Sequence, residues 1–196
     1  MKTLIFSLLL ISLTNRYFAQ VWSKEELEKA NTCKLVDELE ENEKEAIMYI
    51  NLARLYPKKF AKVLLTSYWG PDKYNRYLEG SSYKESLLDR LLNDQNPMPA
   101  INWNEELQAF AACFAQEQGA NGHMGHQRKK CEKGYFYECC AYDMETGLDI
   151  AMQLLIDHNV ESLGHREICL KPELKFVGIK FNTHKKANFC AVLDLN

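Results

Sequence analysis

The sequence predicts an α+β fold in which helices pack on a mostly antiparallel sheet. Helical periodicity dominates the first two thirds of the chain, most clearly over 102–119, whereas strand-like patterns appear late, over 134–142 and 177–193. Helices that precede a late group of strands are typical of α+β domains, because a βαβ protein would alternate the two. A chain of 196 residues fits one domain with one hydrophobic core.

The first residues predict a signal peptide over 1–19. Met1-Lys2 is a short cationic start, and an apolar run of about ten residues follows at 4–13, too short to span a bilayer. Cleavage is expected after Ala19 or Gln20, and the alternative is a buried N-terminal helix. No second apolar run approaches membrane-spanning length, so we expect an exported protein, secreted or periplasmic, without integral membrane association.

The charge argues against nucleic acid as a partner. The full chain carries a net charge of −3 at pH 7, and removal of Lys2 and Arg16 with the signal peptide makes the rest more acidic. Proteins that bind nucleic acid or an anionic membrane surface concentrate positive charge on one face. The densest basic run, Arg128-Lys129-Lys130, is typical of a solvated loop.

The cysteines predict disulfides. All seven follow the signal peptide: Cys33, Cys113, Cys131, Cys139, Cys140, Cys169 and Cys190. In an oxidising compartment this number suggests up to three disulfides and one unpaired thiol, although the sequence does not assign the pairs. A metal-thiolate site is less favoured, because the adjacent Cys139-Cys140 lacks the two-residue spacing that turns both sulfurs toward one ion.

The N-terminal half is expected to be helical. Apolar residues recur at helical spacing within 23–65, and Tyr56-Pro57 marks a break because proline disfavours the helical region for its predecessor. We divide this part into a helical extension, 20–41, and the start of the main domain, 42–196. A surface loop over 66–83 and a short helix over 84–92 follow.

The elements expected after residue 102 contain or flank the candidate site residues. Asn102 or Asn104 can cap an amphipathic helix that Gly119 ends, and its apolar stripe is core packing. A strand is expected over 134–142, a helix over 146–156 that Asp157 ends near its buried face, and a terminal hairpin.

Histidines and carboxylates gather between these elements. The candidate site residues are His126, with His123 as the alternative in the same loop, then Glu138, Asp157 and His165. Imidazoles and carboxylates can bind a metal, move protons or hold a polar ligand once the fold brings them together. His158 and His184 are expected on the surface.

Taken together, the motifs resemble the CAP superfamily (SCP-like extracellular domain; cysteine-rich secretory protein, antigen 5 and pathogenesis-related 1 type), which includes many bacterial exported proteins. The resemblance covers about 42–196 and rests on the order of these segments: Asn51-Leu-Ala-Arg54 with Pro57, Asn102-Trp103 to Leu107, Gly125-His126-Gln-Arg, Glu138, Gln153 to Asp157, Ser162-Leu-Gly-His165-Arg166 and Phe176-Val-Gly-Ile179.

The resemblance implies an α-β-α sandwich with a cleft lined by two histidines and two acids, which fall on His126 (or His123), Glu138, Asp157 and His165. Three features depart from the family pattern. Tyr-Glu-Cys replaces Gly-Glu-Asn around the first acid, the second acid is Asp and not Glu, and Leu154 or a neighbour replaces a tryptophan.

Two functions compete for this cleft. In the first, neutral His126 and His165 bind a divalent metal, zinc, and the acids orient them, so that the protein is an interaction module for a small-molecule, lipid or protein ligand. In the second, the same groups form a metal-dependent hydrolase for a peptide, ester or phosphodiester. The resemblance implies binding and signalling roles more than catalysis, and the His-Glu-x-x-His zinc-protease motif is absent from the sequence.

Further alternatives also stay open. Nucleophilic catalysis through Ser162 or through Cys139 or Cys140 is disfavoured, because the nucleophile-elbow motif is missing and disulfide formation would consume the thiols. The four residues could also form only a hydrogen-bonded structural cluster. Whether the protein is an enzyme therefore remains undecided by the sequence.

Overall fold

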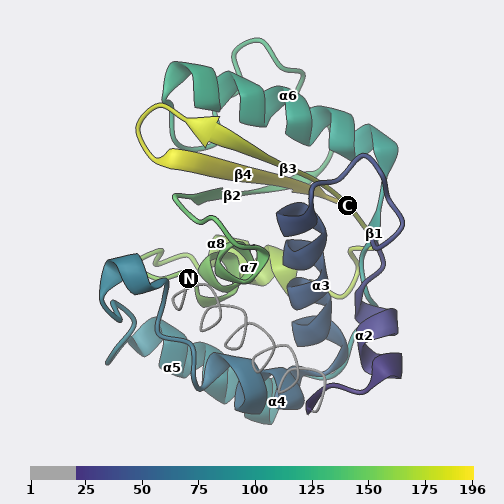
Figure 1. Ribbon diagram of the computed structural model, residues 1–196, viewed down its shortest axis with the longest axis vertical. Coiled ribbons are helices and arrows are strands. Elements are labelled where there is room, and N and C mark those ends of the chain that lie inside the picture. The colour runs from purple at the N-terminus through teal and green to yellow at the C-terminus, as the bar shows by residue number, and fades with distance from the viewer. Residues whose placement is uncertain (1–20) are drawn as a thin grey trace, which may run out of the picture.

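The computed structural model describes residues 21–196, so the predicted signal peptide lies outside the described residues. Its centre is a four-stranded sheet in the order β1-β3-β4-β2 (Figure 1). The strands are β1 (Asn102–Trp103), β2 (Tyr137–Tyr142), β3 (Phe176–His184) and β4 (Asn188–Leu195). β1 runs parallel to β3 and the other two pairs are antiparallel, as the prediction of a mostly antiparallel sheet requires.

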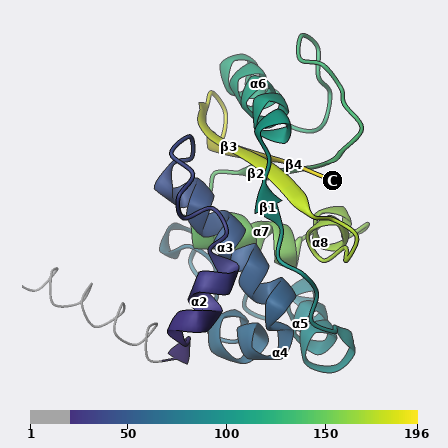
Figure 2. The ribbon, with the colours of Figure 1, turned by 90° about the vertical axis from the view of Figure 1, so that its right-hand side faces the viewer.

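Helices cover both faces of the sheet (Figures 1 and 2). One face carries α6 (Glu105–Asn121), and the other carries α3 (Glu41–Leu55), α7 (Gly147–Ile156) and α8 (Gly164–Cys169). Beyond that second layer lie α2 (Lys24–Ala30), α4 (Pro57–Phe60) and α5 (Ser82–Asp89), with short helical turns at Ala61–Leu65, Asp72–Tyr74 and Arg90–Asp94. The predicted α+β class is confirmed.

The helix α6 packs closely on β3. Asn104 caps it, its side chain accepting a hydrogen bond from the Leu107 amide at 3.0 Å. A Cβ at Gly178 of β3 would lie 2.2 Å from the Leu107 backbone, so only glycine permits this approach of helix to strand. The helix ends at Gly122, at φ 67°, and not at Gly119, which lies inside it against β3.

Two buried polar residues of α3 hold the second layer together. The Asn51 amide donates to the Ala30 and Ile101 carbonyls at 2.9 and 3.0 Å and accepts from the Ile101 amide. The Arg54 guanidinium donates to four backbone carbonyls. One belongs to Cys169, the last residue of α8, and the others to Pro99, Lys171 and Leu174. These two side chains therefore tie Ala30 and the segments 99–101 and 169–174 to α3.

Residues 66–83 are not a simple surface loop. Leu78 is fully buried in the core, and a short 3-10 turn carries Tyr74. The sequence predicted a surface loop because this segment is rich in Gly, Ser, aromatic and charged residues and shows no helical or strand period. The segment instead forms one wall of a cavity, described below.

One disulfide is present within residues 21–196, and it joins Cys113 of α6 to Cys131 of the following loop. The other five cysteines are free and buried, so the structure contains one of the up to three disulfides expected.

Candidate functional site

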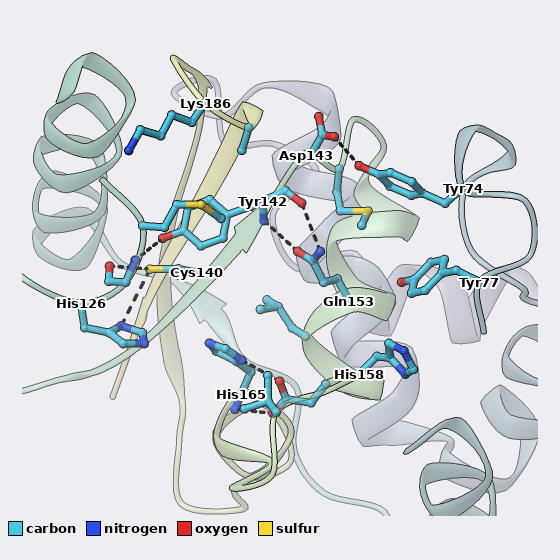
Figure 3. Close-up of a pocket in the computed structure, with 17 residues that line it drawn as sticks. Tyr74, Tyr77, His126, Cys140, Tyr142, Asp143, Gln153, His158, His165 and Lys186 are labelled. Carbon is cyan, nitrogen blue, oxygen red and sulfur yellow. Dashed lines mark hydrogen bonds and ion pairs between the residues drawn. The ribbon is translucent and has the colours of Figure 1, made fainter. Parts of the chain in front are cut away.

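The cavity holds about 750 Å³ and opens between α7, α8, β2 and the loop that precedes β2 (Figure 3). Its polar end is formed by His126, Cys140, Asp157 and His165. Its other side is aromatic and apolar, with Tyr74, Tyr77, Met144, Leu154, His158 and Val160. This volume lies in the range of small-molecule binding sites, about 300–1,000 Å³.

The first histidine is paired with the first acid. His126 Nδ1 lies 2.8 Å from Glu138 Oε1, although twelve residues separate them in the sequence. The loop before them is anchored by the Gly125 amide, which donates to the Tyr142 hydroxyl at 2.8 Å. The hydrogen bond to Glu138 raises the pKa of His126 above its usual value, against the effect of partial burial.

The second histidine is paired with the second acid. Asp157 ends α7 in the left-handed conformation, at φ 54°, and its carboxylate is buried. It accepts from His165 Nδ1 at 2.7 Å and from the His165 and Arg166 amides at 2.9 and 3.3 Å. These amides belong to the first turn of α8, so one carboxylate both starts the helix and orients the imidazole.

Arg166 fixes the junction between α7 and α8. Its buried guanidinium donates to the Leu155 and Ile156 carbonyls at the end of α7 and to Tyr83 and Ser86 of α5. The end of α7 and the start of α8 are therefore held at one fixed angle, which sets the direction of His165.

The two pairs face each other. The ring centroids of His126 and His165 are 6.0 Å apart, with the planes tilted by 40°. Each ring directs Nδ1 to its own carboxylate. Among the residues that the structure describes, neither Nε2 takes part in an intramolecular hydrogen bond. The structure thus places three of the four predicted residues, His126, Asp157 and His165, on the cavity wall, with Glu138 hydrogen-bonded to His126 next to it.

Arg128 is a site residue that the sequence reasoning missed. Its side chain is 3 % exposed and bridges two carboxylates, Glu138 through Nε at 2.8 Å and Asp194 through Nη2 at 2.8 Å. The guanidinium lies between the rings of Phe114 and Phe136. The prediction of a solvated basic loop is wrong for this residue, whereas Lys129 and Lys130 are exposed. Asp194, a lone acid in an apolar strand, was the available signal, because a buried carboxylate needs a partner.

Burial raises the pKa of Asp194 to about 7, with Arg128 acting in the opposite direction and the nearby charge of Glu138 adding to the rise. An acid whose pKa is raised by folding holds its proton more tightly in the folded state. Stability from this group is therefore present at acidic pH and falls as the pH rises from about 4, the usual value for an unfolded Asp, to about 7.

Asp194→Asn should remove this pH dependence. We expect the free energy of unfolding of the variant, relative to the original protein, to increase by roughly 3 kcal/mol between pH 4 and pH 7, because Asn carries no charge to desolvate. Urea unfolding at several pH values measures the difference. A difference that stays constant over this range would mean that Asp194 is already ionised in the folded protein at low pH.

The other histidines lie elsewhere than expected. His184 is buried and its Nε2 donates to the His123 carbonyl, so it is not a surface residue. His158 lines the cavity, bonded to Ser81 and edge-on to Tyr77. His123 lies outside the cavity, with Nε2 buried and without a hydrogen-bond partner among residues 21–196, so the cleft histidine of this loop is His126.

Cys140 adds a sulfur to the polar end. Its Sγ lies 3.9 Å from His126 Nδ1 and 3.9 Å from Glu138 Oε1, and the three ligand atoms form a group able to hold a metal ion. Burial and the charge of Glu138 raise the pKa of this thiol. The spacing argument missed it because it considered only the pair Cys139-Cys140, and not one of them with a histidine.

One comparison with known proteins identifies the family of this chain. The model of the cysteine-rich secretory protein family (CAP) matches residues 48–195. No curated protein shows significant similarity to the chain. Across residues 21–196, every helix is too short or too polar to cross a bilayer.

Proposed function

The chain belongs to the cysteine-rich secretory protein (CAP) family, and we propose that it is an exported member whose cleft binds a zinc ion through His126 and His165. The bound metal would give the cleft its affinity for a ligand. The observation that supports this most is the pair of imidazoles that face each other at 6.0 Å, each with Nδ1 held by a carboxylate.

The donor set fits zinc. Metal-binding histidines almost always donate their second ring N–H to a carboxylate or carbonyl, which fixes the tautomer and makes the imidazole a better ligand. Glu138 and Asp157 are placed to do so at Nδ1. Two imidazoles that share one zinc at Zn–N distances of about 2.0–2.1 Å have centroids roughly 5 Å apart, so the exposed His126 ring would have to move closer to His165.

Each residue has its own role in this site. Asp157 and Glu138 orient the imidazoles, and Arg128 holds the Glu138 side chain in place by pairing with it. Zinc with two protein nitrogen ligands keeps open positions for a polar group of a ligand or for water. The aromatic wall opposite, with Tyr77 and His158, provides the surface for the apolar part of such a ligand. We therefore propose a small molecule, or an exposed segment of a partner, that combines a metal-binding group with an apolar body.

Export is proposed on two grounds. The disulfide Cys113–Cys131 belongs to an oxidising compartment, because cytosolic thiols are kept reduced. The apolar run of residues 4–13 is typical of a signal peptide. We further propose that residues 20–41 are a helical extension of the main domain, since α2 packs on α3 and Trp22 is buried in the core.

A zinc titration of the mature chain at neutral pH tests the proposal. We expect one high-affinity site, and an affinity lower by about 100-fold or more in His126→Ala and in His165→Ala with an unchanged circular dichroism spectrum. His123→Ala is the matched control from the same loop and should bind zinc as the original protein does.

Cobalt in place of zinc identifies the ligands. A metal held by His126 and His165 gives a spectrum without thiolate-to-cobalt charge transfer, unchanged by Cys140→Ser. If His126, Glu138 and Cys140 hold the metal, the spectrum shows a near-ultraviolet band from thiolate-to-cobalt charge transfer. This band is lost in Cys140→Ser and retained in His165→Ala. The second result would replace the two-histidine site by a thiolate site.

A further inference from the structure

Two buried thiols lie beneath the cleft, on the two elements that carry its halves. Cys139 follows Glu138 on β2, and Cys169 is the last residue of α8, four residues after His165. Both are fully buried. Since side chains alternate along a strand, Cys139 faces the layer of α7 and α8, whereas Cys140 belongs to the cluster under α6.

The two side chains approach the same point. Cys139 Sγ lies 4.0 Å from the His165 carbonyl oxygen, in the turn of α8 that precedes Cys169. Cβ bonds in a helix tilt toward its N-terminus, so the Cys169 side chain points back along this turn. Burial raises the pKa of Cys139, and Cys169 is the neighbouring group that contributes most to this rise.

The remaining thiols have other neighbours. Cys33 contacts the Thr32 hydroxyl, Cys140 contacts Gln118, and Cys190 Sγ contacts the Ala115 carbonyl. Of the five free cysteines, Cys139 and Cys169 are therefore the two whose side chains converge on the same turn of α8.

We propose that Cys139 and Cys169 form a second disulfide, which ties β2 to α8 directly beneath the two histidine–carboxylate pairs. As the S–S bond forms, the two thiols give up two protons and two electrons, and the disulfide of an oxidant such as oxidised glutathione takes them up and becomes two thiols. Because both thiols are buried in the folded protein, the bond forms during folding, in the compartment that also forms Cys113–Cys131.

This bond has a consequence for the site. Cys139 is covalently next to Glu138, and Cys169 is one helical turn from His165. A bridge between them limits how far the two halves of the cleft can separate. The inference does not depend on zinc binding, and its test contains no metal.

Thiol counting and peptide mapping test the pair. The chain without its signal peptide is refolded in a glutathione redox buffer, alkylated under denaturing conditions and digested. Of seven cysteines, we expect three alkylated thiols and a peptide that links the 139–140 segment to Cys169. Fragmentation between Cys139 and Cys140 should place the bond on Cys139 in the original protein, so that no variant needs to fold.

Two variants test which of the adjacent cysteines forms the bond. Cys139→Ala should release the partner thiol and raise the count to four, whereas Cys140→Ser, the adjacent matched control, should keep the linked peptide and leave two alkylated thiols. Five thiols in the original protein would overturn the inference, and so would a linked peptide in which Cys140 carries the bond. Either of these outcomes leaves the proposed zinc site untouched, because that site is measured separately.

Discussion

Arg128→Met should destabilise the protein by about 3–5 kcal/mol at about pH 8, one of the largest effects expected of a single substitution here. Arg128 is the cation between Glu138 and Asp194, which lie opposite each other in the register of β2 and β4. Without the guanidinium, two buried carboxylates face each other. Methionine keeps the contact with the two phenylalanine rings, so the loss reports charge and hydrogen bonding more than packing.

The loss should shrink at about pH 5, because Asp194, whose pKa is about 7, then takes up a proton and removes one of the two charges. Urea unfolding at the two pH values measures both effects. Adding Asp194→Asn should recover part of the loss at the higher pH. Lys129→Met is the matched control, since Lys129 is exposed in the same loop. A loss below about 1 kcal/mol, or one that does not change with pH, would contradict the bridging role of Arg128.

Asp157→Asn should lower the affinity for zinc by about 10–100-fold while the protein still folds. Asn tolerates the left-handed conformation that residue 157 adopts, and it can still accept from the His165 amide. It carries no charge, however, so it holds the Nδ1–H tautomer of His165 less firmly and makes the imidazole a weaker ligand.

Zinc titration by calorimetry, together with a thermal melt, separates binding from stability in this variant. Glu161→Gln removes one exposed negative charge from the neighbouring loop and should leave both quantities unchanged. Equal affinities for Asp157→Asn and the original protein would show that Asp157 is only a helix-terminal acceptor.

The local parts of this fold were predictable. Asn104 and the apolar stripe that follows it specify α6, because a cap and a 3.6-residue period act within one element. Asp157 was predicted to end its helix beside the buried face, and its buried carboxylate found the partner His165 only eight residues away. The family resemblance placed His126 and Glu138, which no short-range rule joins.

The long-range parts were not predictable from one sequence. Arg128 looks like one of three solvated cations until β4 brings Asp194, 66 residues later, against it. His184 ends β3 beside a polar turn, yet its ring packs against Tyr142 of β2. Tyr77 belongs to a segment without periodicity and reaches the cavity because the neighbouring Leu78 is buried. In each case the deciding partner is distant in sequence, so only the assembled layers bring the two together.

Metal analysis of the native protein, with His165→Ala purified in parallel, tests the central claim most directly. The proposed site predicts close to one zinc per chain in the original protein and little in the variant, with both samples folded. Zinc that is absent from the original protein and not taken up at neutral pH would contradict the claim, and so would equal zinc contents in the two samples.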